Sequence, residues 1–188
     1  SKKKLAINSI YFEQKILKEV VGSQDQIAAT YGGFNKIVFK KNGSFVIKPL
    51  GIKNKTIKKL NKNLLLVYTG YKRTAHHIAK SYVNKLQTSK KSYILKISNY
   101  VKKAEKALKK GKTDKFGELL NDAWEAKKKL SKSITNPAIN KIYDKAIKSG
   151  ALGGKLLGAG GGGFFVFYVP YYRQKKFIKN FRKLINIP

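Results

Sequence analysis

Two short segments contain the residues best suited to chemistry. One is a glycine run, Gly158-Ala159-Gly160-Gly161-Gly162-Gly163, and the other is a segment with a carboxylate, Gly22-Ser23-Gln24-Asp25-Gln26. Residues without side chains let the backbone approach a ligand or another loop closely. A carboxylate is a standard candidate for acid or base catalysis, but an aspartate in the first turn of a helix also stabilises the helix dipole whatever its function. Asp25 by itself therefore does not establish a catalytic site.

The glycine run lies between two apolar segments, Lys155-Leu156-Leu157 and residues 164–169. Glycine-rich segments are often flexible linkers, but a linker is not expected between two strands. The run lacks the Gly-Lys-Ser/Thr ending of a P-loop, and it opens a strand where P-loop and Rossmann fingerprints open a helix. The sequence therefore predicts a tight turn that approaches either a ligand or another loop.

Patterns that bind metals are weak in this sequence. His76 and His77 are adjacent, so on a helix they point about 100° apart and cannot form the i, i+4 pair of a helical metal site. The carboxylates are scattered over predicted helices and do not form a cluster. We therefore predict no metal site within the chain.

The composition indicates a folded protein without cysteine chemistry. The chain has 188 residues, 42% of them hydrophobic, and no cysteine, which excludes disulfides, thiolate zinc sites and cysteine nucleophiles. Apolar runs such as Leu64-Leu65-Leu66-Val67 are far too short to span a bilayer, and the residues after Ser1 do not form a signal peptide. We expect a soluble cytoplasmic protein with no membrane partner.

The net charge of +33 raises the alternative of a basic nucleic-acid-binding module. The positive charge is almost all lysine, whereas recognition of phosphates and bases usually enriches arginine. Lysines such as Lys127-Lys128-Lys129 are interleaved with glutamates along predicted helices, which is typical of solvated surface. This pattern therefore argues against nucleic-acid binding, which stays open as the interpretation from a different functional class.

Hydrophobic periodicity predicts the elements that position these residues. The predicted helices span residues 2–21, 23–29, 74–86, 92–110, 113–131, 137–149 and 172–184. The predicted strands span residues 34–40, 44–48, 64–69, 155–157 and 164–169. This order of elements favours an α+β fold in which helices cover one face of a small sheet.

Local signals mark several of these boundaries. Ser23 and Thr113 are suited to N-caps, and Pro137 follows Asn136 at a helical first position. The pair Asn42-Gly43 is the strongest short signal for a β-hairpin. The lysine-rich stretch 51–62 is predicted to be an irregular connection between two structural units, with a boundary near residue 55.

The segment 150–164, Gly150-Ala151-Leu152-Gly153-Gly154-Lys155-Leu156-Leu157-Gly158-Ala159-Gly160-Gly161-Gly162-Gly163-Phe164, resembles the third motif of the GHMP kinases. At its full length it is similar to the heptose 7-phosphate kinase branch of that family. The resemblance extends to residues 22–26, residues 31–35, Tyr68-Thr69-Gly70 with Arg73, Ala123-Trp124-Glu125, and residues 133–137. It therefore covers nearly the whole chain.

The resemblance implies a GHMP kinase C-terminal domain over residues 56–188, with a ferredoxin-like sheet and covering helices. Residues 1–55 would be the closing helices and hairpin of the N-terminal domain. The implied activity is ATP- and Mg²⁺-dependent phosphorylation of the anomeric hydroxyl of D-glycero-D-manno-heptose 7-phosphate, on the route to lipopolysaccharide. A fucose or galactose kinase is the alternative within the family.

The resemblance also implies roles for individual residues. Asp25 would act on the attacking hydroxyl as a base or as a group that orients it. Arg73 would bind the phosphate of the sugar, while Thr69 and Tyr31 would line the sugar pocket. The floor of the active site would be formed by Gly158, Ala159, Gly160, Gly161 and Gly162.

The family's ATP-phosphate loop, Gly-Leu-Gly-Ser-Ser, has no counterpart in this sequence. We therefore expect the chain alone to be inactive, and we expect a missing N-terminal half to complete the site. We also expect Asp25 to lie close to the glycine run in the complete enzyme, because the family's active site lies between its two domains. Trp124, at an apolar helical position, is expected in the core.

Overall fold

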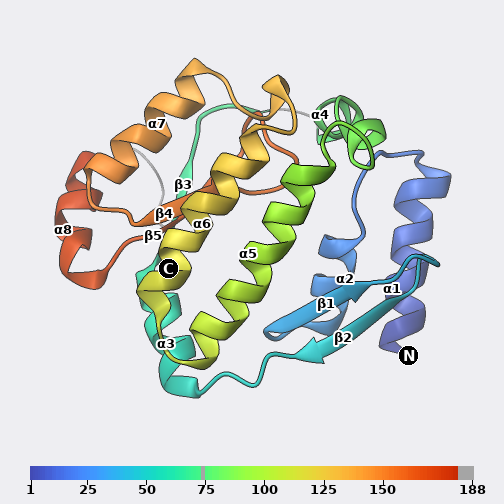
Figure 1. The fold of residues 1–188 in the computed structure, drawn as a ribbon, viewed down its shortest axis with the longest axis horizontal. Coiled ribbons are helices and arrows are strands. Elements are labelled where there is room, and N and C mark those ends of the chain that lie inside the picture. The colour runs from blue at the N-terminus through green and yellow to red at the C-terminus, as the bar shows by residue number, and fades with distance from the viewer. Residues whose placement is uncertain (73–74, 182–188) are drawn as a thin grey trace. The chain divides into compact units, whose positions relative to one another are not determined.

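The computed structural model describes residues 1–72 and 75–181 and divides the chain into two compact units, Ser1–Gly51 and Ile52–Pro188. The sequence predicts a boundary nearby, at residue 55. The elements of both units are labelled in Figure 1. The mixed helix and sheet architecture confirms the predicted α+β class.

The first unit combines two helices with a β-hairpin. Its elements are α1 (Lys2–Tyr11), a π-helical turn (Phe12–Ile16), α2 (Gln24–Tyr31), β1 (Asn35–Phe39) and β2 (Phe45–Pro49). The hairpin is antiparallel with Phe39 opposite Phe45, as predicted. In its loop, Gly43 has a φ of +79°, and the side-chain oxygen of Asn42 accepts hydrogen bonds from the N–H and hydroxyl of Ser44. The Asn-Gly pair thus supplies the turn geometry that the hairpin requires.

The prediction of one helix over residues 2–21 is wrong in its second half. The regular helix ends at Tyr11, and after the π-helical turn the chain leaves the helix at Lys18, which has a φ of +54°. The side-chain amide of Gln14 donates a hydrogen bond to the carbonyl of Val21 at 2.9 Å. This bond ties the segment after the helix back onto it, so the chain turns toward α2.

The second unit is built on a three-stranded antiparallel sheet in the order β3-β5-β4. Its strands are β3 (Leu64–Tyr68), β4 (Gly153–Leu156) and β5 (Phe164–Tyr168). Its helices are α3 (Asn54–Asn63), α4 (Ala75–Lys80), α5 (Lys91–Lys109), α6 (Thr113–Lys128), α7 (Pro137–Lys148) and α8 (Tyr171–Asn180). In Figure 1, α5 and α6 run side by side, and α6 lies over the sheet. In the ranges 1–72 and 75–181, no helix is both long and apolar enough to cross a membrane.

Two predicted elements of this unit need correction. The stretch 51–62 is not an irregular connection, because it contains α3, which buries Thr56, Leu60 and Asn63 at helical spacing. The helix predicted over residues 74–86 is shorter, since α4 ends at Lys80 and the Ser81 hydroxyl donates to the carbonyl of Ile78 at 2.7 Å. A side-chain bond of this kind competes with the backbone bonds that would extend the helix.

The remaining helices lie close to their predicted positions. Helix α7 has the predicted cap, since the Asn136 side chain accepts a hydrogen bond from the N–H of Ile139 at 2.9 Å. Thr113 is not an N-cap but the first residue of α6. The predicted end of the last helix, beyond residue 181, lies outside the described residues.

Aromatic side chains fill the core between the sheet and its helices. Trp124 is completely buried, as predicted, and its ring centroid lies 5.5 Å from that of Phe165. The Tyr143 ring lies 5.6 Å from the rings of both Phe165 and Phe167, and the Phe177 ring from α8 lies 5.8 Å from Phe167. This cluster joins α6, α7 and α8 to β5.

Helix α6 comes closest to the sheet at a pair of glycines, one in the helix and one in β4. A Cβ atom at Gly117 would lie 2.6 Å from Cδ1 of Tyr168, and a Cβ atom at Gly153 would overlap the carbonyl oxygen of Gly117. Real Cβ atoms do not come so close to other atoms. Glycine at both positions therefore lets the backbone of α6 rest directly on β4.

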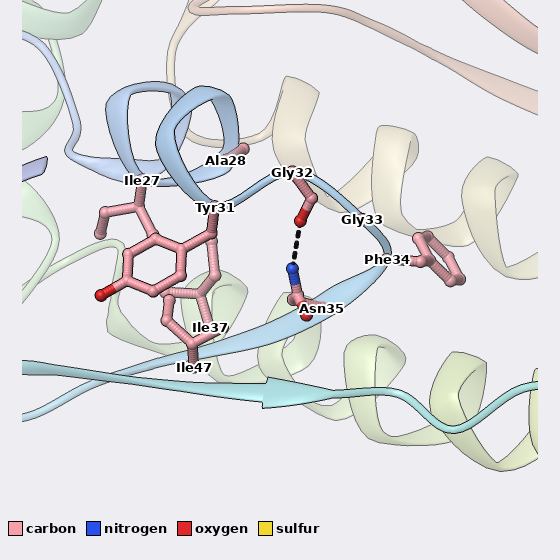
Figure 2. A pocket seen from close by; sticks show the side chains of 9 residues that line it. All are labelled: Ile27, Ala28, Tyr31, Gly32, Gly33, Phe34, Asn35, Ile37 and Ile47. Carbon is pink, nitrogen blue, oxygen red and sulfur yellow. Dashed lines mark hydrogen bonds between the residues drawn. The ribbon is translucent and has the colours of Figure 1, made fainter. Parts of the chain in front are cut away.

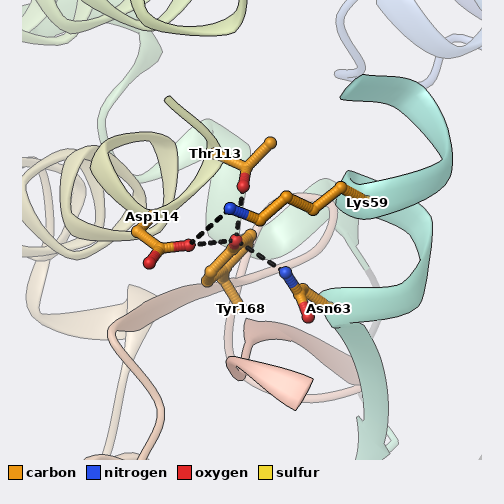
Figure 3. Close-up of polar contacts among 5 residues, drawn as sticks. All are labelled: Lys59, Asn63, Thr113, Asp114 and Tyr168. Carbon is orange, nitrogen blue, oxygen red and sulfur yellow. Dashed lines mark hydrogen bonds and ion pairs between the residues drawn. The ribbon is translucent and has the colours of Figure 1, made fainter. Parts of the chain in front are cut away.

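Polar side chains around the hydroxyl of Tyr168 join α3, α6 and β5 (Figure 3). The buried hydroxyl accepts from the Asn63 side-chain N–H at 2.8 Å, lies 2.8 Å from the Thr113 hydroxyl, and donates to the Asp114 carboxylate at 2.7 Å. Lys59 lies 3.8 Å from the same carboxylate oxygen. Burial raises the pKa of Tyr168 to about 12, and the Asp114 carboxylate also raises it. Tyr168 therefore stays neutral and satisfies the surrounding polar groups.

We predict that Gly117→Ala destabilises the chain. Overpacking costs about 1–3 kcal/mol, which exceeds the roughly 1 kcal/mol that alanine gains over glycine inside a helix. Denaturant unfolding measures the net change. Gly22→Ala is the control, because a Cβ atom at Gly22 has no neighbour within 4 Å. A Gly117→Ala protein as stable as the parent would contradict the close packing of α6 on the sheet.

We predict that Tyr168→Phe lowers the free energy of unfolding by about 1–3 kcal/mol near neutral pH, because buried Asn63 loses its acceptor. The folded-state pKa of Tyr168 lies above its ordinary value of 10.0. Its contribution is therefore complete below pH 10 and declines as the pH rises from 10 toward 12. The gap between parent and variant should narrow over that range.

Denaturant unfolding at several pH values measures this gap. Tyr172→Phe is the matched control, because the Tyr172 side chain is 75% exposed. It should leave the free energy of unfolding unchanged throughout. A gap for Tyr168→Phe that stays constant from pH 8 to pH 12 would show that the hydroxyl does not carry the alkaline dependence.

Candidate functional site

The glycine run forms the loop between β4 and β5, as the sequence predicts. The loop closes where the N–H of Leu157 donates to the carbonyl of Phe164 at 2.8 Å. Within it, Gly158, Gly160, Gly161 and Gly163 have positive φ angles of 68°, 124°, 76° and 88°. Side chains rarely adopt such backbone conformations, so the shape of this loop requires glycine.

Two other loops press against the glycine loop. A Cβ atom at Gly160 would lie 2.8 Å from the carbonyl oxygen of Ile134, and one at Gly162 would lie 2.6 Å from the carbonyl oxygen of Tyr71. Ile134 is part of the short 3₁₀ turn Lys132–Ile134 before α7, and Tyr71 follows β3. The glycines are therefore required for contact as well as for backbone conformation.

Hydrogen bonds fix the glycine loop on three sides. The N–H of Gly161 donates to the carbonyl of Ile134, and the N–H of Gly163 donates to the carbonyl of Tyr71, both at 2.8 Å. On the third side, the Lys127 ammonium donates to the carbonyl of Gly158 at 2.5 Å. The loop is thus a held structure and not a flexible linker.

The interpretation of residues 127–129 as solvated surface is wrong for Lys127. It is half-buried and bonded to the glycine loop. Lys128 is also half-buried, and its ammonium pairs with the carboxylate of Glu125 at 2.6 Å. Only Lys129 of the three is exposed. Sequence reasoning missed this role because a lysine that donates to a backbone carbonyl looks the same as any other surface lysine.

Four backbone N–H groups of the loop are left without such bonds. Those of Gly158, Ala159, Gly160 and Gly162 form no hydrogen bond with the residues that the structure describes. Successive backbone N–H groups in a loop of this type form a concave site that favours anions. The loop can therefore present donors to a phosphate or to sugar hydroxyls.

Thr69 supports the loop from β3. Its side chain is buried, and its hydroxyl donates to the carbonyl of Gly163 at 2.8 Å while accepting from the N–H of Tyr71 at 3.3 Å. The hydroxyl therefore helps to join the two loops. That Thr69 also lines a sugar pocket stays a prediction.

Asp25 lies in the first turn of α2 in the first unit, where a short helix is predicted. Its side chain is exposed and forms no hydrogen bond or ion pair with the described residues. Ser23 is the N-cap residue, but its hydroxyl does not cap the helix and instead accepts from the Gln14 amide at 3.2 Å. The Asp25 carboxylate is thus free to accept a hydrogen bond from a ligand.

The residue next to Asp25 was missed by sequence reasoning. The side chain of Gln26 is buried, and its amide nitrogen donates to the Glu13 carboxylate at 2.5 Å, which joins α2 to the turn after α1. Its side-chain oxygen is buried and unbonded among the described residues. Pairing of Gln26 with Glu13 has no sequence signal, because the two residues lie in different elements.

A pocket of about 190 Å³ lies between the end of α2 and the hairpin (Figure 2). Tyr31 and three isoleucines, one from α2 and two from the hairpin, give it apolar walls. The Asn35 amide donates to the carbonyl of Gly32 at 2.5 Å on its polar side. The residues that line it are Ile27, Ala28, Tyr31, Gly32, Gly33, Phe34, Asn35, Ile37 and Ile47. None of them is charged, so this pocket offers a phosphate no charged side chain.

The structure gives little information on the other candidate residues. Arg73 lies outside the described residues, and so do the side chains of His76 and His77. Among the residues described, no group of three or more histidines, aspartates or glutamates is arranged to hold a metal ion. The structure describes the two units separately, so the expected approach of Asp25 to the glycine loop stays a prediction.

Comparisons with known proteins agree with these features. Residues 104–184 match the family model of the GHMP kinases C-terminal domain. The chain is 35% identical over 172 residues to the D-glycero-alpha-D-manno-heptose 7-phosphate kinase of Campylobacter jejuni, covering 91% of this chain and 51% of that protein.

Solved structures give the same picture. A putative sugar kinase from Campylobacter jejuni superposes with a TM-score of 0.67 at 30% identity, covering 99% of this chain and 53% of that one. A D-glycero-D-manno-heptose 1-phosphate kinase from Bacteroides thetaiotaomicron superposes with a TM-score of 0.66 at 25% identity, covering 100% and 52%. The chain spans about half the length of these relatives. The loop between β4 and β5 thus lies within residues 104–184, the region that matches the GHMP kinases C-terminal domain.

Proposed function

We propose that the chain is part of an ATP-dependent kinase that phosphorylates the anomeric hydroxyl of D-glycero-D-manno-heptose 7-phosphate. The observation that carries this proposal is the 35% identity to the Campylobacter jejuni heptose 7-phosphate kinase. Because that match covers 91% of the chain, it includes both Asp25 and the glycine loop. The proposed site therefore lies within the part of the chain that is similar to this kinase.

The glycine loop suits the electrostatic part of phosphoryl transfer. Such reactions depend mostly on positioning and on stabilising the charge of the phosphoryl oxygens. The free N–H groups of Ala159, Gly160 and Gly162 would donate to these oxygens or to the sugar. Because Ile134, Tyr71 and Lys127 hold the loop, the donors need little rearrangement when the substrate binds.

Asp25 would act on the nucleophile. Its exposed, unbonded carboxylate can accept a hydrogen bond from the anomeric hydroxyl and take up its proton as the hydroxyl attacks the γ-phosphate. The acceptor bond holds the hydroxyl in line for attack, and this orientation matters even where proton transfer is late. Asp25 would thus be the catalytic residue of the first unit.

The remaining residues would recognise the sugar phosphate. Arg73 would bind the phosphate on the sugar through its planar guanidinium, which pairs with phosphate oxygens in a bidentate manner. Tyr31 and Thr69 would contact the sugar itself. The proposal for Tyr31 is supported by its position on the wall of the pocket beside α2.

Mg²⁺ would accompany ATP, as in other phosphoryl transfers, where it neutralises charge on the phosphates. The described residues do not fit a metal site of their own, because they contain no suitable group of acidic or histidine side chains. We therefore assign no step to Mg²⁺ on this chain. The proposed product would enter the supply of activated heptose for lipopolysaccharide in the cytoplasm.

A fucose kinase is the alternative within the family. The chain is 36% identical over 103 residues to the L-fucokinase/L-fucose-1-P guanylyltransferase of Bacteroides fragilis, but it covers only 11% of that protein. Assaying heptose 7-phosphate, fucose and galactose in parallel, with ADP release as the readout, separates these activities. Turnover with heptose 7-phosphate alone is expected.

We predict that Asp25→Asn strongly lowers turnover in a kinase that joins these residues to the remaining part of the relatives. Loss of a general base lowers kcat by about 10²- to 10⁴-fold, whereas the sugar KM should change little because other contacts bind the sugar. Steady-state kinetics with heptose 7-phosphate and ATP measure both constants. Asp144→Asn, the same change at an exposed position of α7, is the control and should leave both unchanged. An unaltered kcat would remove Asp25 from the mechanism.

We predict that residues 1–188 alone release no ADP above background with heptose 7-phosphate and ATP. The relatives are about twice as long, and this chain contains no glycine-rich loop that opens a helix toward the ATP phosphates. The same assay on the joined protein should give turnover. Robust turnover by residues 1–188 alone would show that the chain holds a complete ATP site.

A further inference from the structure

The contact of Lys127 with the glycine loop involves one particular peptide group. The ammonium donates to the carbonyl of Gly158 at 2.5 Å, and it also donates to the carbonyl of Leu156 at 3.5 Å. Leu156 is the last residue of β4, and Gly158 is the first glycine of the loop. Hydrogen bonds from a charged donor are roughly twice as strong as neutral ones. Helix α6 therefore holds the start of the loop through a charged group.

The carbonyl of Gly158 belongs to the same peptide group as the N–H of Ala159. A trans peptide group is planar, and its carbonyl and N–H point in opposite directions. Because Lys127 bonds the carbonyl on the side of α6, the N–H of Ala159 points away from this helix. That N–H forms no hydrogen bond with the described residues. Lys127 thus fixes the direction of a donor on the opposite side of the peptide group.

This restraint matters because glycine allows a wide range of backbone conformations. Gly158 has a φ of +68°, so the peptide plane that follows it can rotate unless an external contact holds it. A hydrogen bond to the carbonyl also polarises the whole peptide group and so strengthens its N–H as a donor. Lys127 supplies both effects to the N–H of Ala159.

The other unbonded N–H groups of the loop lack such support. Each belongs to a peptide group whose carbonyl accepts no hydrogen bond within the part of the chain that the structure describes. These are the N–H groups of Gly158, Gly160 and Gly162. The N–H of Ala159 is therefore the one among the four whose direction and strength a charged side chain determines.

We propose that Lys127 is a positioning residue, whose ammonium orients and polarises the peptide group between Gly158 and Ala159 so that the N–H of Ala159 donates to the phosphoryl group being transferred. Lys127 acts through this peptide group and does not touch the phosphate itself. The positive charge behind the donor also favours an anion on the opposite side. The identity of the phosphate rests on the proposed function, whereas the contact of Lys127 with the loop does not.

The first test is NMR spectroscopy of ¹⁵N-labelled residues 1–188 during titration with inorganic pyrophosphate at constant ionic strength. The amide resonance of Ala159 should move as pyrophosphate binds. Lys127→Met keeps an unbranched side chain but removes the ammonium, so the Kd measured at this amide should rise about tenfold. Lys127→Arg keeps the charge and the N–H donors, and it should restore most of the affinity.

Two further variants make this titration decisive. Lys129→Met is the same change at an exposed position two residues away, and it should leave the Kd unchanged. Lys127→Gln keeps a neutral donor, should give an intermediate Kd, and takes the place of Lys127→Met if circular dichroism shows that the methionine variant unfolds. The proposal is overturned by an Ala159 amide that ignores pyrophosphate or responds equally in Lys127→Met. An equal loss of affinity in Lys129→Met would also overturn it, because the loss would then follow from net charge alone.

The second test is steady-state kinetics of the joined kinase with heptose 7-phosphate and ATP. Lys127→Met should lower kcat about tenfold and change the sugar KM by less than about twofold, because the donor acts on the transferred phosphoryl group and not on the bound sugar. A lysine that only supports the fold would leave the kcat of the folded protein unchanged, and that result would overturn the proposal. If the parent joined protein shows no turnover, the proposed function fails, and the pyrophosphate titration still decides the role of Lys127.

Discussion

The second unit depends on the direct contact between the backbones of α6 and β4. Gly117 and Gly153 leave no side chain between the helix and the strand, and the ring of Tyr168 packs against the same glycine of the helix. This close approach sets the depth at which α6 lies on the sheet. It brings Trp124 against Phe165 in the core, and it places the end of α6 beside the loop between β4 and β5. The contact between α6 and β4 therefore determines both the packing of the core and the position of the candidate site.

The close packing of α6 on β4 also holds the glycine loop of the candidate site in place. Lys127, near the end of α6, can reach the carbonyl of Gly158 only because the helix lies so close to β4. The carbonyls of Ile134 and Tyr71 bond the other side of the loop, so segments far apart in sequence converge on a few glycines. A loop built this way holds its backbone donors in a fixed arrangement. Fixed donors are what electrostatic stabilisation of a phosphoryl group requires.

Features with local chemistry could be predicted from the sequence, and features that depend on distant contacts could not. Asn42-Gly43 predicted the hairpin and Asn136-Pro137 the start of α7, since each signal acts within a few residues. Helix α3 was missed because its lysines obscure a buried face of only three residues. In the site, the glycine run was recognisable. The carbonyls of Ile134 and Tyr71 were not, because every residue has a carbonyl and only the fold decides which ones point at the loop.

The two parts of the proposed site differ in what holds them. The glycine loop belongs to a unit with a large aromatic core, whereas Asp25 belongs to a unit in which three side chains are buried. Phosphoryl transfer depends on placing the hydroxyl, the carboxylate and the phosphate donors within hydrogen-bonding distance of one another. A carboxylate on a poorly supported helix cannot hold such a position by itself. The proposed catalysis therefore needs further contacts that fix α2, and with it Asp25, even where those contacts do not touch the reacting atoms.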